Sequence, residues 1–160
     1  MPSGRRGPAI GDTRGAMSRE NVAAAKRIYQ ARNRGDVDAV LAECAPDVTW
    51  RPHLAALGGK PIRGHDEVRA YMASLQEDWE GFRHEPEEFF DAGDKVVAFL
   101  HTYARGPGSG VEVEVPVAHV LEFEDGKCLG YVSYHDRAEA LRVAGLRGDV
   151  RNPARRTPKP

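Results

Sequence analysis

Residues 111–134 limit the fold more than any other stretch of the chain. Their sequence, VEVEVPVAHVLEFEDGKCLGYVSY, predicts two antiparallel strands joined at Asp125-Gly126, because an Asp-Gly pair suits the tight turn of a hairpin. One histidine, His119, stands among apolar residues on the first of these strands. We therefore expect a curved sheet with a pocket on one face, and we expect the imidazole of His119 to face that pocket.

Charge and hydropathy exclude two classes of partner. The 160-residue chain has the length of one domain, and its formal net charge is −1. Residues 1–17 carry +2 and residues 147–160 carry +4, which leaves −7 on residues 18–146. An acidic body is poorly suited to nucleic acid, and no apolar run approaches the roughly 18–20 residues of a membrane span. We expect neither a specific nucleic-acid partner nor a membrane partner.

The two ends of the chain differ in composition from its centre. Residues 1–17 and 147–160 are rich in Gly, Pro and Arg and lack periodicity, which predicts disorder for both segments. The folded domain is then expected at residues 18–146, and Met17, just before it, is a candidate initiator.

Cofactor and metal motifs are missing from the sequence. Cys44 and Cys128 form neither a disulfide framework nor a zinc-ligand pattern, so we expect no metal and reduced thiols, as in a cytoplasmic protein. The Gly-rich segment 106–110 joins two expected strands and has no helix after it, so it does not resemble a phosphate-binding loop. We expect a protein that works without a cofactor.

Hydrophobic periodicity predicts helices first and strands afterwards. Helices are expected from Ser18 to Gly35, after Asp36, over residues 66–79 and after Asp136. Strands are expected at 47–50, 82–90 and 96–105 and in the hairpin, with Pro86 at an edge or bulge and Pro116 at a bulge. This order predicts an α+β domain, a cone-shaped barrel in which a curved antiparallel sheet wraps around helices on one face and encloses a pocket.

Six segments together resemble a known family. They are SRENVAAAKRIYQARNRGDVDAVL, PDVTWRP, RGHDEVRAY, DAGDKVV, GSGVEVEVPVAHVLEFEDGK and HDRAEALRVAGL. In this order they are similar to the SnoaL-like branch of the nuclear transport factor 2-like superfamily, which includes ketosteroid isomerases, polyketide cyclases, scytalone dehydratase and limonene epoxide hydrolase. The resemblance implies the cone-shaped fold and a homodimer. It does not imply one reaction, because one fold hosts many chemistries.

The resemblance also assigns roles to individual residues. Tyr29 matches the hydrogen-bond donor on the first helix of ketosteroid isomerase, and His119 falls where that enzyme has an acid on its sheet. The isomerase carboxylate that shuttles the proton falls at or next to Pro52, where only His53 can ionise. The isomerase pattern is therefore broken, and members that use histidine with aromatic hydroxyls, such as scytalone dehydratase and cyclases, are more similar.

These considerations predict a catalytic group and a pocket wall. We expect His119 as the acid or base, Tyr29 or Tyr131 as the hydrogen-bond donor and His53 as a second proton carrier. His84 lies in a charged segment and is expected to be solvated. The expected ligand-binding residues are Trp50, Tyr71, Leu75, Trp79, Leu100, Thr102, Val117, Leu121, Tyr131, Ser133 and His135.

Two functions are compatible with the sequence. The first is a cofactor-free isomerase, cyclase or dehydratase that acts on a hydrophobic, ring-containing metabolite by His-mediated proton transfer. The alternative is a non-catalytic ligand-binding or dimerisation module of the same fold. A pocket filled by Trp50, Tyr71 and Trp79 would favour the module, whereas an open cavity with His119 at its base would favour the enzyme.

Overall fold

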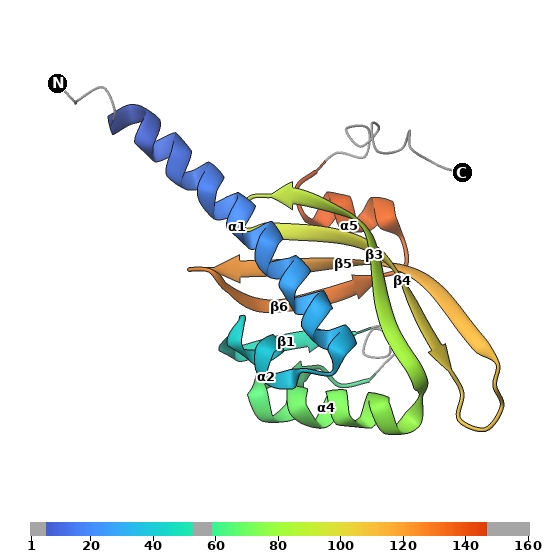
Figure 1. Cartoon of the computed structure of the whole chain (residues 1–160). Helices are drawn as coiled ribbons and strands as arrows, with labels where there is room; N and C mark the ends of the chain where they lie inside the picture. The colour runs from blue at the N-terminus through green and yellow to red at the C-terminus, as the bar shows by residue number, and fades with distance from the viewer. Residues whose placement is uncertain (1–5, 53–58, 147–160) are drawn as a thin grey trace.

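The computed structural model describes residues 6–52 and 59–146, with side chains from residue 15 onward. In this part of the chain, four helices pack with one six-stranded sheet (Figure 1). The helices are α1 (Arg6–Arg34), α2 (Val37–Ala42), α4 (Gly64–Asp78) and α5 (Arg137–Val143). The strands are β1 (Cys44–Arg51), β2 (Ile62–Arg63), β3 (Glu80–Ala92), β4 (Lys95–Arg105), β5 (Glu112–Glu124) and β6 (Lys127–Tyr134).

The sheet has the strand order β2-β1-β6-β5-β4-β3. The α+β class and the curved sheet wrapped around helices are confirmed. The sheet is mixed, because β1 pairs with β6 in parallel while every other neighbouring pair of described strands is antiparallel. It is also unclosed, since β2 and β3 remain as its two edges.

The hairpin expected at residues 111–134 is present as β5 and β6. Asp125 and Gly126 have φ values of 51° and 80°, the two left-handed conformations that a type I′ turn requires. On β5, His119 lies between Ala98 of β4 and Ser133 of β6. Three strands therefore fix the position of this histidine.

The two strand prolines behave differently. The β3–β4 register shifts between Pro86 and Glu88 on an edge strand, as predicted. The bulge expected at Pro116 is wrong, because this residue pairs with His101 without a register shift. β6 pairs with β5 only from Ala118 onward, so at Pro116 the side of β5 that faces β6 has no strand partner. A proline, which lacks a backbone N–H, is tolerated at such a position because no hydrogen bond to β6 is lost.

Both faces of the sheet are covered. Val96, Ala98 and Leu100 pack in the cluster that contains α1, whereas Val97 packs with α5 on the opposite face. This alternation follows from the two-residue period of a strand. The expectation of helices on one face alone is therefore wrong: α1 crosses one face and α5 lies on the other (Figure 1).

The first helix is longer than expected. It begins at Arg6, so Ser18 lies inside it rather than at its start, and residues 6–17 are helical instead of disordered. It ends at Arg34, just before Gly35, whose φ of 73° suits a helix end. The remaining segments that we expected to be disordered, 1–5 and 147–160, lie outside the described residues.

Gly130 is required where β6 meets β1. Its φ is 149°, and a Cβ atom there would overlap the carbonyl oxygen of Thr49. Gly130→Ala should therefore lower the free energy of unfolding by about 3 kcal/mol or more in urea denaturation. The clash is with backbone atoms of Thr49, which cannot move aside as the end of a flexible side chain can. Gly106→Ala is the control, since there the nearest atom is the flexible Ser109 hydroxyl. A Gly130→Ala protein as stable as the control would contradict this account.

Candidate functional site

A cavity of about 240 Å³ lies between α4 and the inner face of the sheet. It exceeds the ~150 Å³ of an apolar cavity that takes up benzene, so it has room for a ring. Most of its wall is apolar, with a few polar groups among the apolar ones, as is typical of small-molecule sites. The lining residues are Pro52, Tyr71, Leu75, Trp79, Phe82, His84, Thr102, Ala104, Val113, Val115, Val117, His119, Tyr131 and Ser133.

His119 lies in this cavity wall with 3% of its surface exposed. Its ring stacks on Tyr131 with centroids 4.4 Å apart. Its Nδ1 atom is 2.7 Å from the hydroxyl of Tyr29, which reaches it from α1. The imidazole is therefore held on one side by α1 and meets the cavity with the other.

The surroundings of His119 define its protonation. Burial, together with the positive charge of Arg32, holds the pKa of His119 well below its ordinary value of about 6.5. Burial raises the pKa of Tyr29 well above its usual value, so the phenol keeps its proton. A buried hydroxyl needs an acceptor, and Nδ1 of His119 lies within hydrogen-bond distance of the Tyr29 hydroxyl. We therefore assign the neutral tautomer with the proton on Nε2, which makes His119 a hydrogen-bond donor.

A second imidazole belongs to the same cavity. His84 is 5% exposed and its ring centroid lies 5.4 Å from that of His119, so the expectation of a solvated side chain is wrong. Its Nδ1 atom is 3.0 Å from the Thr102 hydroxyl, while its buried Nε2 atom has no partner among the described residues. Burial, and then the positive charge of Arg32, lower the pKa of His84 well below 6.5.

His84 could have been found from strand periodicity. Its neighbours Arg83 and Glu85 are charged, which suggested a solvated segment. Residues two apart on a strand share a face, however, and Phe82 is two residues from His84. Asn33 then anchors the strand, because its side chain exchanges two hydrogen bonds with the backbone of His84 at 2.6 and 2.9 Å.

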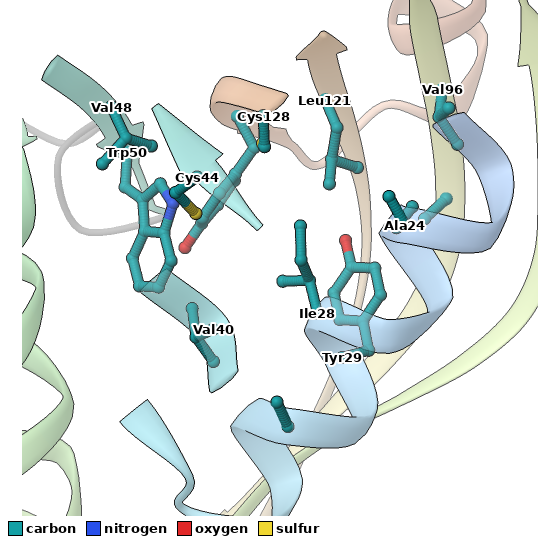
Figure 2. Packing of buried hydrophobic residues seen from close by; sticks show 14 of the residues in the cluster. Ala24, Ile28, Tyr29, Val40, Cys44, Val48, Trp50, Val96, Leu121 and Cys128 are labelled. Carbon is teal, nitrogen blue, oxygen red and sulfur yellow. The ribbon is translucent and has the colours of Figure 1, made fainter. Parts of the chain in front are cut away.

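Several expected wall residues lie elsewhere. Trp50, Leu100 and Leu121 are at most 2% exposed and belong to the core instead of the cavity lining. Figure 2 shows Trp50 and Leu121 among the packed core side chains. These large apolar side chains lie at strand positions that other side chains cover completely. Trp50 supports the wall from behind, with ring centroids 5.3 Å from Tyr131 and 6.1 Å from Tyr71.

The other expected residues divide into three groups. Tyr71, Leu75, Trp79, Thr102, Val117, Tyr131 and Ser133 line the cavity together with His119. Tyr29 is in the core (Figure 2), where its hydroxyl contacts Nδ1 of His119 and its ring lies 5.9 Å from the ring of His119 and 5.8 Å from that of His84. His135 is exposed and outside the lining, and His53 lies outside the described residues.

The described residues contain no metal-binding group. Within residues 6–52 and 59–146, no cluster of three or more His, Cys, Asp or Glu side chains could hold a metal ion. Among the described helices, none has the length and apolar character needed to cross a membrane.

Acidification should destabilise the fold through the two buried imidazoles. Both have folded-state pKa values below the unfolded value of about 6.5. As the pH falls through this value, the unfolded chain therefore binds more protons than the folded protein does. Above about pH 6.5 the two histidines do not lower the free energy of unfolding. Below it, each histidine should lower that free energy by about 1.4 kcal/mol per pH unit. Urea denaturation between about pH 7.5 and about pH 5.5 measures the slope.

The variant His84→Gln should lose about half of that slope. A slope unchanged by His84→Gln would mean that this imidazole does not stay neutral in the fold.

The tautomer of His119 is open to direct observation. Long-range proton–nitrogen correlation NMR should show Nε2 protonated and Nδ1 unprotonated, because Nδ1 accepts from Tyr29. Tyr29→Phe removes that donor and should abolish the preference. A proton on Nδ1 in the unaltered protein would overturn the assignment.

Comparison with known proteins agrees with this architecture. A family model for the SnoaL-like domain matches residues 25–131. A crystal structure of an NTF2-like protein of unknown function from Burkholderia pseudomallei is 30% identical, covers 78% of this chain and 97% of its own, and has a TM-score of 0.65. A search of curated proteins finds no match.

Two more distant structures share the fold. TerC, co-crystallised with polyporic acid, is 23% identical over 79% of this chain and 98% of its own, with a TM-score of 0.64. A protein with a ketosteroid isomerase-like fold from Catenulispora acidiphila, in complex with trimethylamine, is 19% identical over 79% and 95%, with a TM-score of 0.63. The family model covers more than half of the chain, and the chain therefore belongs to the SnoaL-like family of the NTF2-like superfamily.

Proposed function

We propose that this protein binds a hydrophobic, ring-containing small molecule in its cavity and moves a proton on it without a cofactor. The observation that carries the proposal is the pair of buried imidazoles, His84 and His119, in the wall of one largely apolar cavity. An apolar wall accepts a ring, and two uncharged imidazoles supply one proton donor and one proton acceptor. The reaction class is isomerisation, cyclisation or dehydration.

His119 is the donor in this proposal. Its Nε2–H donates a hydrogen bond to a carbonyl oxygen of the ligand and stabilises the negative charge that develops there as an enolate forms. Tyr29 acts behind it by holding the tautomer. Ser133 pairs with His119 across β5 and β6 and lines the same cavity, so its hydroxyl is a second donor.

His84 is the base in this proposal. When the Thr102 hydroxyl accepts the proton of Nδ1, Nε2 carries the lone pair and faces no competing partner among the described residues. It takes a proton from the carbon next to the carbonyl and returns it to another carbon in isomerisation, or to a leaving hydroxyl in dehydration. The imidazole centroids are 5.4 Å apart, so one small group of the ligand can contact both. In this proposal His84 has the role of second proton carrier that we expected for His53.

The open cavity supports a ligand-binding role over a purely structural one. Trp50 is in the core, and Tyr71 and Trp79 stand in the wall without filling the space of about 240 Å³. Structures of similar fold were solved with molecules as different as polyporic acid and trimethylamine. The ligand of this chain is therefore inferred from its own side chains instead of from its fold.

We also propose a homodimer in the cytoplasm. The dimer is supported by the family resemblance, and the compartment by Cys44 and Cys128, which are both buried and free. Sedimentation analysis tests the dimer, and a purely monomeric protein would contradict it.

Proton transfer can be tested with the bicyclic ketone β-tetralone in deuterated buffer. The protein should accelerate exchange of the protons next to the carbonyl, and His119→Gln or His84→Gln should slow it by about 100-fold or more. His135→Gln, an exposed control, should exchange at the unaltered rate. Ligand-detected NMR follows binding of the ketone in parallel.

Binding of β-tetralone with no exchange above buffer would favour the non-catalytic ligand-binding module. An absence of binding would contradict the pocket proposal itself.

A further inference from the structure

We infer that the ligand carries an acidic group and that Arg32 binds it beside His84. The inference rests on the proposed binding of a small molecule and adds the charge of that molecule. It comes from the surroundings of one arginine, which are unlike those of any other described arginine.

Arg32 is half-buried near the end of α1 and is surrounded by aromatic side chains. Its guanidinium lies 4.4 Å from the ring of Trp50 and 5.6 Å from that of Tyr131, and it donates a long hydrogen bond of 3.4 Å to the Tyr131 hydroxyl. Tyr71 is a further aromatic neighbour of the group. None of these neighbours is a carboxylate.

Other described arginines are either paired or exposed. Arg27, Arg34, Arg69, Arg83, Arg105 and Arg137 each lie within 4.0 Å of an Asp or Glu carboxylate. The unpaired ones whose side chains are described, Arg19, Arg51, Arg63 and Arg142, are exposed to water. Arg32 alone among the described arginine side chains is partly buried and has no carboxylate partner. A shielded charge without a counter-ion is costly, and an anion brought by a ligand would remove that cost.

The chemistry of the guanidinium leaves room for such an anion. Stacking on an aromatic face uses the flat side of the group and leaves its N–H edge available. Of its five N–H donors, the geometry commits one to Tyr131. A carboxylate matches the remaining donors through two parallel hydrogen bonds.

A smaller cavity of about 110 Å³ lies at Arg32 and adjoins the larger one. The two cavities share Leu75, Phe82 and His84 in their walls, and neither described wall contains an Asp or Glu. The unpartnered Nε2 atom of His84 is a second polar group at this junction. The geometry therefore accommodates a ring in the larger cavity and an anionic oxygen group in the smaller one.

The position of Arg32 in the last turn of α1 offers a different explanation for this arginine. A cation near the C-terminal end of a helix interacts favourably with the helix dipole. That role requires charge alone, which Arg34 in the same turn already supplies. Interaction with the helix dipole does not require that the guanidinium be surrounded by aromatic rings and lack a carboxylate partner. The two explanations differ in what they predict for ligand charge.

The probes are trans-cinnamate and its uncharged amide, cinnamamide, which share a ring and an arm and differ in the acid group. Isothermal titration near neutral pH should show cinnamate binding roughly 10- to 100-fold more tightly than cinnamamide, as expected for hydrogen bonds to a charged group. Arg32→Gln should abolish this preference by weakening cinnamate binding far more than cinnamamide binding. Arg32→Lys should keep part of it, and Arg19→Gln, exposed on the same helix, should keep all of it.

Equal affinities of the unaltered protein for both probes would overturn this inference and leave the proposed function standing. Arg32→Gln weakening both probes equally would also overturn it, because Arg32 would then only support the wall. Failure of both probes to bind would contradict the pocket proposal and the inference together.

Discussion

The contact between Tyr29 and His119 is the interaction on which the site depends. It joins α1 to β5 at 2.7 Å, between residues that are ninety positions apart in the sequence. Both side chains are buried, so neither has water as an alternative partner. Because the phenol keeps its proton, the imidazole presents the other nitrogen to the cavity. One hydrogen bond thus couples the packing of a helix on a sheet to the chemistry of the cavity wall.

Much of the fold follows from local patterns. The Asp-Gly turn, the capping residues Asp36 and Asp136 and the helical stripe of α4 each act through neighbours in the sequence, and each occurs where the sequence predicts it. The parallel pairing of β1 with β6 was not foreseen, because it joins segments that no turn connects. The early start of α1 does not follow from the sequence, because Gly and Pro usually indicate disorder, whereas the residues from Arg6 onward are helical.

The candidate site shows the same division. His119 was found because a lone histidine in an apolar strand is conspicuous, whereas His84 was missed because its neighbours are charged. Trp50, Leu100 and Leu121 were expected in the wall since size and hydrophobicity do not separate a lining residue from one that is fully covered. The sequence does not single out Arg32, because an arginine on a helix usually lies in solvent, and only the assembled fold shows aromatic rings around it. Sequence patterns identify which side chains point inward better than they identify which of those meet a hollow.

The central claim is that the space between α4 and β5 receives a ligand whose polar end meets the two imidazoles. A crystal structure of the protein with trans-cinnamate tests it most directly. The account predicts the ring against Val115 and Val117, the carboxylate on Arg32, and an oxygen within hydrogen-bond distance of a His84 or His119 nitrogen. Cinnamate bound elsewhere, or a cavity closed by its own side chains with the imidazole of His119 turned towards solvent, would contradict it.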